Sequence, residues 1–403
     1  MTRPLLYSIL MGYGHQRAAY ALADAFDVEP QRIDAPPGAA PDESRAWDRS
    51  RFTYELCSRL YRRPVVGLVP RRFLDALTSI RPHVPRGPSP WITRAVRFQA
   101  KLIRHGLGRG VVRRMRQTGA PMITTFYTPG LAADYAGLDR AYVVVTDTDV
   151  HRVWAPAIAS RTRIHYLVPS RRAIHRLASY GVPRDRITWT GFPLPPELVG
   201  DETADVLRRN LEARVRRLDP ERPSAPPHLV LAVGGAGAQA DLADRLLLAL
   251  GERVREERLR ITLVAGTRPE VARGFATDVR RARLEGHAGI RVLLADDFPS
   301  YYRAFNALLA DADVLWTKPS ELVFYAGLGI PLILAPPLGG QERYNAIWVA
   351  RAGAGLPQGR PEEAGTWFVD MLESGRLARA AGNGFRHLPH GGTHRIVEAV
   401  GDA

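Results

Sequence analysis

The chain has a single cysteine and no long apolar run. Among its 403 residues, Cys57 is the only cysteine, which excludes an internal disulfide framework and a cysteine-rich zinc site. No run of about 18 uninterrupted apolar residues occurs, so we expect no membrane-spanning helix. The apolar start of the chain lacks a small-residue cleavage site and leads into a glycine-rich turn, which favours a buried strand over a secretory signal. We expect a cytoplasmic protein.

Positive charge is unevenly distributed, and lysine contributes little of it. The formal net charge is +15, the only lysines are Lys101 and Lys318, and residues 51–120 hold 16 basic and 2 acidic side chains. The rest of the chain is close to neutral. A nucleic-acid binder usually spreads its charge more widely. The pattern therefore indicates a local basic patch, and we expect no nucleic-acid partner.

A basic amphipathic segment is predicted over residues 81–116. It starts with a proline-rich loop, and residues 91–104 have helical periodicity. The apolar face of this helix would carry Trp91, Ala95, Phe98 and Leu102, and the basic face Arg94, Arg97, Lys101 and Arg104. Such a helix suits the anionic inner surface of a membrane, to which the protein would bind peripherally. The alternative is a core-facing helix with a solvated arginine face.

Short apolar runs alternate with helix-like segments along both halves of the chain. Leu5–Leu10 precedes the helix-like Gln16–Phe26, and a second series begins with the apolar run at Leu229. This alternation is typical of parallel sheets covered by helices on both faces. We predict an α/β protein with two doubly wound, Rossmann-like domains facing a central cleft. The predicted parts are an N-terminal domain 1–195, a linker region 196–227, a C-terminal domain 228–380 and a C-terminal helix 381–403 that packs back on the N-terminal domain.

The segment Gly12-Tyr13-Gly14-His15 lies between the first predicted strand and the first predicted helix. Glycines let the backbone turn tightly and approach a ligand, and the helix N-terminus favours an anion. An imidazole at the carboxyl end of a strand is suited to general base catalysis. His15 is therefore a candidate base, and a helix-capping histidine is the structural alternative.

Asp147, Asp149, His151 and Arg152 follow the predicted buried strand at 141–146. Charged groups in this position are costly to bury without a purpose. An Asp-x-Asp metal site is one interpretation, but the pattern around it does not favour one and we expect no metal. The preferred interpretation is that Asp147 or Asp149 orients His15 or a substrate hydroxyl. A salt-bridged turn is the alternative.

Two further polar segments lie in the second half of the chain. Gly234-Gly235-Ala236-Gly237 follows the first strand there, and its amides could cradle a diphosphate. Thr317-Lys318-Pro319-Ser320-Glu321 follows a later strand, and Gly339–Asn345 carries Gln341, Glu342 and Asn345. These side chains suit phosphate, ribose and sugar hydroxyls.

These segments together resemble the metal-independent, inverting glycosyltransferases of family 28, which have the GT-B fold. The matching segments are GYGHQRAAYAL (12–22), VTDTDVHRVW (145–154), YLVPS to GFPL (166–194) and TKPSEL to GAG (317–355). The family includes the peptidoglycan N-acetylglucosaminyltransferase and diacylglycerol glycosyltransferases. The resemblance implies an acceptor-binding N-terminal domain and a C-terminal domain that binds a nucleotide-diphosphate sugar, most simply a UDP-sugar, with no other cofactor.

The resemblance also implies roles for individual residues. His15, Asp147 and Asp149 would act in catalysis. The implied acceptor-side residues are Tyr13, Tyr127, His151 and Trp154. The implied donor-side residues are Gly14, Gly234, Gly235, Gly237, Thr267, Phe298, Lys318, Ser320, Glu321, Gln341, Glu342 and Asn345.

The chain departs from the family between Thr317 and Pro331. This loop is shorter, Ser320-Glu321 replaces a Gly-Gly pair, and Phe324 stands where the family has a ribose-binding glutamate seven residues before the proline. Glu321 would replace that glutamate. The expected function is transfer of a sugar to an acceptor hydroxyl, on a lipid or at a membrane. The alternatives are a nucleotide-sugar epimerase of the same fold, a non-catalytic binding protein and, least favoured, a nucleic-acid binder.

Overall fold

The computed structural model describes residues 3–40, 43, 47, 92–232, 242–337 and 339–401. They belong to two compact units. The first unit draws on Met1–Leu194, Gly339–Tyr344 and Gly391–Ala403, and the second on Pro195–Leu338 and Asn345–His390. Trp91, Gly234, Gly235 and Gly237 lie outside the described residues, so the roles predicted for them stay predictions.

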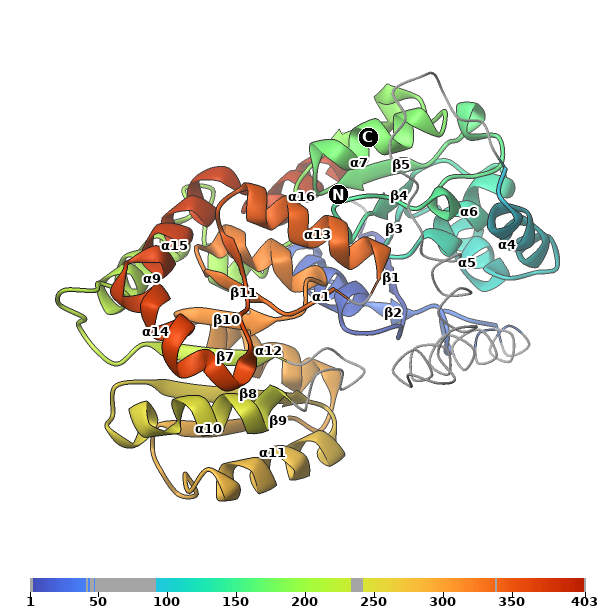
Figure 1. Ribbon diagram of the computed structural model, residues 1–403. Coiled ribbons are helices and arrows are strands. Elements are labelled where there is room, and N and C mark those ends of the chain that lie inside the picture. Colours follow the sequence, from blue (N-terminus) through green and yellow to red (C-terminus); the bar gives the residue numbers. More distant parts are fainter. Residues whose placement is uncertain are drawn as a thin grey trace. The chain divides into compact units, whose positions relative to one another are not determined.

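The first unit contains one parallel six-stranded sheet in the order β2-β1-β3-β4-β5-β6 (Figure 1). Its strands are β1 Leu5–Ser8, β2 Gln31–Arg32, β3 Met122–Thr124, β4 Ala141–Val144, β5 His165–Val168 and β6 Ile187–Trp189. Its helices are α1 Gly14–Phe26, α4 Arg94–Arg104, α5 Arg109–Thr118, α6 Tyr127–Tyr135, α7 Arg171–Ser179 and α16 Gly392–Gly401, with 3-10 turns η1 Arg152–Trp154, η2 Ala159–Arg161 and η3 Arg184–Arg186.

Side-chain alternation along β4 explains why helices cover both faces of this sheet. Tyr142 and Val144 pack in one cluster with residues of α1 and α16. Val143 points to the opposite face and packs in another cluster with residues of α6 and α7. Because a parallel strand is buried on both sides, the sequence of β4 is apolar throughout rather than alternating.

The second unit contains another parallel six-stranded sheet, in the order β12-β11-β10-β7-β8-β9. Its strands are β7 His228–Ala232, β8 Arg260–Gly266, β9 Ile290–Leu294, β10 Val314–Thr317, β11 Leu332–Leu334 and β12 Gly355–Pro357. Its helices are α8 Pro196–Val199, α9 Asp205–Arg217, α10 Leu242–Arg255, α11 Pro269–Arg281, α12 Phe298–Asp311, α14 Ala364–Glu373 and α15 Arg376–His387, with 3-10 helices η4 Glu321–Leu328 and η5 Pro361–Glu363. Helix α13, Gly340–Arg351, begins in the part of the chain that groups with the first unit.

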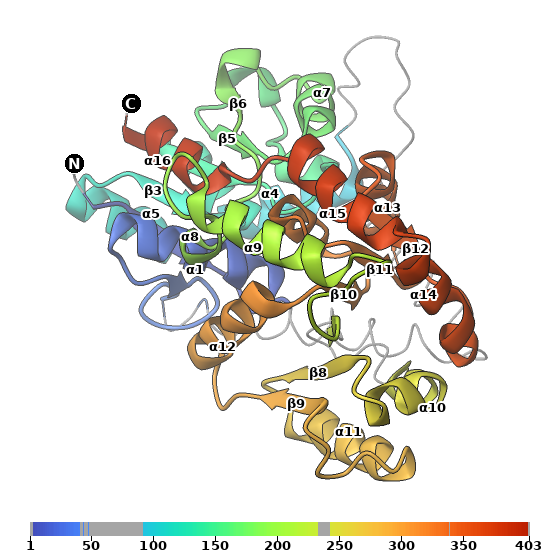
Figure 2. The same cartoon turned by 90° about the vertical axis from the view of Figure 1, so that its left-hand side faces the viewer.

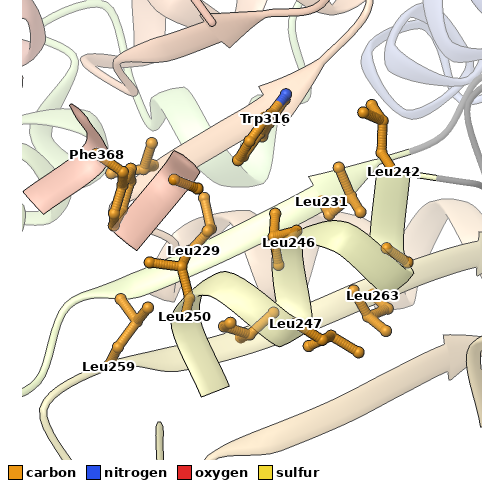
Figure 3. Close-up of a cluster of buried hydrophobic side chains, with 14 of the residues drawn as sticks. Leu229, Leu231, Leu242, Leu246, Leu247, Leu250, Leu259, Leu263, Trp316 and Phe368 are labelled. Carbon is orange, nitrogen blue, oxygen red and sulfur yellow. The ribbon is translucent and has the colours of Figure 1, made fainter. Parts of the chain in front are cut away.

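A leucine-rich core holds α10 against the second sheet. Figure 2 shows α10 and α11 beside β8 and β9. Leu246 and Leu250 of α10 are completely buried and point toward the strands, where Leu231 and Leu263 meet them (Figure 3). Burying one such side chain contributes about 1.5–3 kcal/mol. The prediction of two doubly wound α/β domains is therefore confirmed.

The region predicted as a linker, 196–227, holds α8 and α9 and is part of the second unit. Arg214 of α9 is 1% exposed and donates to the backbone carbonyls of Leu309, Ala312 and Leu328. These carbonyls lie at the ends of α12 and η4, where the helices leave acceptors unpaired. Prolines and charges suggested a connector, but one buried guanidinium ties this segment into the core.

Helix α4, Arg94–Arg104, begins three residues later than predicted and packs inward through Val96. Thr93 caps it by accepting from the amide of Val96. Val96 is 3% exposed, whereas Phe98 is 62% exposed. Two residues along a helix correspond to a rotation of about 200°, so burial of Val96 turns Phe98 outward. The exposure of Phe98 does not fit the alternative of a core-facing helix, and the membrane-facing interpretation stays a prediction. Among the described residues, no helix is both long and apolar enough to cross a bilayer.

Candidate functional site

His15 lies in the first turn of α1, beyond the carboxyl end of β1. Gly12 has φ +84°, a conformation that glycine adopts without strain, and it turns the chain from the strand into the helix. The imidazole Nδ1 lies 2.6 Å from the backbone carbonyl oxygen of Thr125, which follows β3. A carbonyl only accepts, so Nδ1 carries the proton in this contact, and the lone pair of a neutral imidazole is on Nε2. This is the protonation pattern of a general base.

Aromatic rings surround the His15 imidazole. Phe126 meets it edge-on with 5.2 Å between ring centroids, and Trp154 lies 6.4 Å away. Tyr127 contacts both of these rings, at 4.2 Å from Phe126 and 5.4 Å from Trp154. Burial raises the pKa of the Tyr127 hydroxyl. The structure thus brings His15 together with two of the predicted acceptor-side residues, Tyr127 and Trp154, and Tyr13 precedes the helix as its N-cap residue.

Asp149, one of the two predicted catalytic carboxylates, is completely buried in an ion pair. Its oxygens accept from Arg176 at 2.8 and 2.9 Å and from Arg172 at 2.5 Å. A fourth bond comes from the amide of Val150. Two arginines compensate the charge of this carboxylate. The geometry therefore favours the salt-bridged turn over a carboxylate that contacts a substrate.

Asp147 is the more accessible of the two carboxylates. It is partly exposed at the same strand end, where Thr146 and Thr148 are buried. The hydroxyl of Thr146 lies 3.4 Å from Nδ1 of His15, which places this strand end beside the imidazole. Within the described parts of the chain, no group of three histidine, cysteine, aspartate or glutamate residues is arranged to hold a metal ion.

His151 caps the short helix η1. Its Nδ1 accepts from the amide of Val153 at 3.2 Å, and the side chain is largely buried. Burial, and to a smaller extent the nearby Arg152, lowers the pKa of His151 to about 4. The imidazole is therefore neutral near pH 7. Arg152 locks the same turn by donating to the carbonyls of Ala155 and Pro156.

In the second unit, several predicted donor-side residues follow the carboxyl ends of strands. Thr267 comes directly after β8 and Phe298 begins α12 after β9. Lys318, Ser320 and Glu321 come directly after β10 and are partly exposed. Thr317 of β10 donates to the carbonyl of Ala232 at the end of β7, which holds these two strand ends together. Parallel sheets bind ligands at this edge.

The shortened loop after β10 folds as η4, a 3-10 helix. Phe324 is 2% exposed and meets Trp348 edge-on at 5.3 Å, so the position of the family's glutamate is occupied by a core ring. A 3-10 helix has three residues per turn, so residues i and i+3 share a face. Glu321 therefore lies on the same face as Phe324, one turn nearer to the strand.

Helix α13 carries the remaining donor-side candidates. Gln341 and Glu342 are in its first turn and are partly exposed. Asn345 is completely buried, which is unexpected for a residue predicted to face a sugar. Its burial favours a structural contact over a direct one.

Thr125 and Phe126 were not singled out from the sequence. Both directly follow β3, on the chain between the two motifs that were recognised. Their position beyond a strand end is the signal that could have found them.

Comparison with known proteins gives partial sequence matches. The processive diacylglycerol beta-glucosyltransferase of Staphylococcus carnosus is 26% identical over 223 residues, which are 55% of this chain and 50% of that protein. The enzyme of the same name from Staphylococcus saprophyticus is 21% identical over 248 residues, 60% of this chain and 56% of that protein. The chain therefore matches about half the length of these relatives.

Solved structures match nearly the whole chain. MurG of Acinetobacter baumannii has a TM-score of 0.54 at 17% identity, and the match covers 99% of this chain and 100% of that one. The chain has the GT-B fold. A putative UDP-N-acetylglucosamine 2-epimerase of Listeria monocytogenes has a TM-score of 0.55 at 13% identity, and S. aureus MnaA, solved with UDP, has 0.53 at 12%. Both matches cover 99% of this chain and 96% of the other.

One family also matches part of the second GT-B domain. Its description is "Domain of unknown function (DUF6938)", and it matches residues 270–378. This stretch contains Phe298 and the whole segment from Thr317 to Asn345. The resemblance to family 28 that the motifs indicated agrees with the glucosyltransferase relatives and with the MurG-like fold.

Proposed function

We propose that this protein is an inverting, metal-independent glycosyltransferase that moves a sugar from a nucleotide-diphosphate donor to an acceptor hydroxyl. The observation that carries the proposal is His15, whose Nδ1 contact with the Thr125 carbonyl leaves Nε2 as the basic nitrogen. The imidazole takes the proton of the acceptor hydroxyl, and the oxygen attacks the anomeric carbon in one displacement. Asp147 assists this proton transfer from the end of β4, where Thr146 lies beside the imidazole.

The donor would bind to the second unit. Lys318, Ser320 and Glu321 follow β10, and Glu321 would bind the ribose because it is partly exposed at this strand end, whereas Phe324 is buried. Backbone amides and Lys318 would stabilise the departing diphosphate in place of a metal ion. The names of the glucosyltransferase relatives support a sugar donor, and the UDP in the MnaA structure supports UDP as its nucleotide.

The acceptor would be a lipid hydroxyl at an anionic membrane surface. On α4, Phe98 is exposed next to the exposed cations Arg94, Arg97 and Lys101. On α5, Arg109, Arg113 and Arg116 line a shallow hollow of about 370 Å³. An apolar ring within a basic surface suits the boundary between headgroups and acyl chains. The diacylglycerol in the relatives' names supports the same acceptor class.

A nucleotide-sugar epimerase is the second candidate. It is favoured by the similarity in fold to the Listeria monocytogenes protein, a putative UDP-N-acetylglucosamine 2-epimerase. An epimerase converts its donor without an acceptor, whereas a transferase of the proposed kind needs one.

The test begins with thermal stability against nucleotides and UDP-sugars in excess EDTA. A ligand at about 100 times its Kd stabilises the protein by about 2.7 kcal/mol. The sugar that shifts the Tm is then supplied with diacylglycerol in anionic vesicles, and the anomeric configuration of the product is measured. Transfer with inversion in EDTA is expected. A strict metal requirement, or conversion of the donor without acceptor, would reject the proposal.

A further inference from the structure

Thr125 holds three separate groups at the carboxyl edge of the first sheet. Its amide donates to the carbonyl of Tyr7 in β1. Its hydroxyl donates to the backbone carbonyl of His15 at 2.9 Å, and its own carbonyl accepts from the His15 ring at 2.6 Å. The side chain of Thr125 is completely buried. Thr125 therefore hydrogen-bonds both the backbone and the imidazole of His15, a residue 110 positions away in the sequence.

We infer that Thr125 is the positioning residue of the proposed base, and this inference rests on the proposed function. The carbonyl of Thr125 keeps the imidazole proton on Nδ1, so the lone pair stays on Nε2. When the ring gains a proton, the same contact becomes a charge-assisted hydrogen bond and stabilises the imidazolium. A neutral carbonyl thus fixes the tautomer of His15 and stabilises its imidazolium, which is the role that a carboxylate has in other histidine-based sites.

The hydroxyl of Thr125 fixes that carbonyl relative to the backbone of His15. It fixes the first turn of α1 to the end of β3, so the distance between the Thr125 carbonyl and Nδ1 depends on it. The hydroxyl of Thr146 is also near Nδ1, but at 3.4 Å it is a much weaker contact. Misplacement of a catalytic group by about 1 Å can lower a rate about 100-fold. Loss of the Thr125 hydroxyl is therefore expected to affect the rate more than the stability.

Thr124, the neighbouring residue at the end of β3, offers a control. It is completely buried like Thr125, and its hydroxyl donates to a backbone carbonyl at the same distance of 2.9 Å. That carbonyl belongs to Phe126 rather than to His15. The Thr124 hydroxyl also accepts from the amide of Phe126 at 3.2 Å. Replacing either threonine by valine removes a buried hydroxyl at about 1 kcal/mol for each hydrogen bond lost, so Thr124→Val should cost at least as much stability as Thr125→Val.

The experiment compares Thr125→Val, Thr125→Ser and Thr124→Val in transfer assays and thermal unfolding. We expect a kcat at least tenfold lower in Thr125→Val, with unchanged KM for the donor. Thr125→Ser, which keeps the hydroxyl, should recover most of the rate. Thr124→Val should lower the Tm at least as much as Thr125→Val but retain kcat. Equal loss of kcat in the two valine variants would overturn the positioning role.

A second measurement separates this inference from the proposed reaction. Nitrogen NMR of the histidine side chains, with His15 assigned through His15→Gln, reports which ring nitrogen carries the proton whether or not transfer occurs. Above the pKa of the ring we expect the proton on Nδ1 in the wild type and a mixture of tautomers in Thr125→Val. A proton on Nε2 in the wild type would overturn the inference. Lack of transfer with the proton on Nδ1 would reject the proposed function instead.

Discussion

Asp149 and Arg176 form a doubly hydrogen-bonded ion pair in the interior of the first unit. Both side chains are almost inaccessible, and the two contacts are 2.8 and 2.9 Å long. Arg172, from the same helix, completes the compensation of the carboxylate. The pair ties the strand end that carries Asp147 to α7. The sequence does not distinguish Asp147 from Asp149. In the structure, arginines neutralise Asp149, whereas Asp147 is partly exposed.

The two carboxylates should respond differently to amidation. Asp149→Asn leaves Arg176 buried without a charge partner, so we expect a loss of about 3–5 kcal/mol of stability. Asp147→Asn should leave the Tm nearly unchanged and lower kcat. Thermal unfolding and transfer assays on both variants test this. A large fall in Tm for Asp147→Asn, with none for Asp149→Asn, would show that Asp147 is the structural carboxylate.

His15→Ala removes the proposed base. The expected loss in turnover is about 100-fold or more, with the donor-induced shift in Tm retained because the donor binds to the second unit. Transfer rate and nucleotide-dependent Tm are measured on the same preparation. Unchanged turnover would remove His15 from the role of base.

His151 should make stability depend on pH between about 4 and 6.5. Its pKa is about 4 in the folded protein against 6.5 for an ordinary histidine, so the unfolded chain binds more protons in this window. Stability therefore falls as pH falls through it, by up to about 3 kcal/mol from this group. His151→Asn keeps an oxygen that can cap η1 but does not titrate.

The measurement is the Tm difference between His151→Asn and the wild type at several pH values. We expect this difference to move in favour of the asparagine variant as pH drops from 6.5 toward 4. Parallel Tm curves for the two proteins would show that His151 does not change its protonation on unfolding in this range.

Arg214 should be among the most sensitive positions of the second unit. Burial lowers the pKa of its guanidinium to about 10, which leaves it charged near pH 7. Arg214→Met leaves several buried carbonyls without a donor, at about 1–3 kcal/mol each. Arg209→Met is the control on the same helix, because that arginine is 67% exposed and forms a surface ion pair with Asp205.

We expect a Tm many degrees lower for Arg214→Met, and almost no change for Arg209→Met. Urea unfolding of both variants gives the free energies directly. Similar small losses in the two would mean that the carbonyls find other donors and that α9 is not held by this contact.

Membrane binding should depend on Phe98 and on its basic neighbours. Phe98→Ser and Arg97→Gln are expected to weaken binding to anionic vesicles, with about 1 kcal/mol for each cation. The controls are Leu248→Ser, whose side chain is 60% exposed on α10, and Arg280→Gln on α11. Vesicle sedimentation at two salt concentrations measures the change. Equal effects at both pairs of sites would indicate binding through net charge and general hydrophobicity.

Much of the fold could be predicted because local patterns repeat. The apolar runs of β1, β4 and β7 and the helix-like segment of α1 have the expected type and nearly the expected bounds. Helix α6 has no such pattern, since it is buried around most of its surface and Gly130 lies against Val143 of β4. The two-residue strand β2 is too short to leave a periodic signal.

The site could be predicted less completely than the fold. His15, Tyr127 and Trp154 were recognised and lie together, but Thr125 was not, because nothing in a lone threonine indicates which carbonyl it will meet. The outward turn of Phe98 likewise follows from the packing of Val96. Such contacts join residues that are far apart in the chain.

The sequence by itself determined the two parallel α/β sheets, the placement of the glycine-histidine segment after the first strand and the basic character of α4. These depend on periodicity and on the chemistry of neighbouring residues. Only the tertiary structure decided that Asp149 is neutralised by arginines, that Phe324 is a core ring and that Thr125 grips His15. Burial and hydrogen bonding between distant segments determine whether a polar side chain is available to a substrate, and neither is encoded in local sequence order.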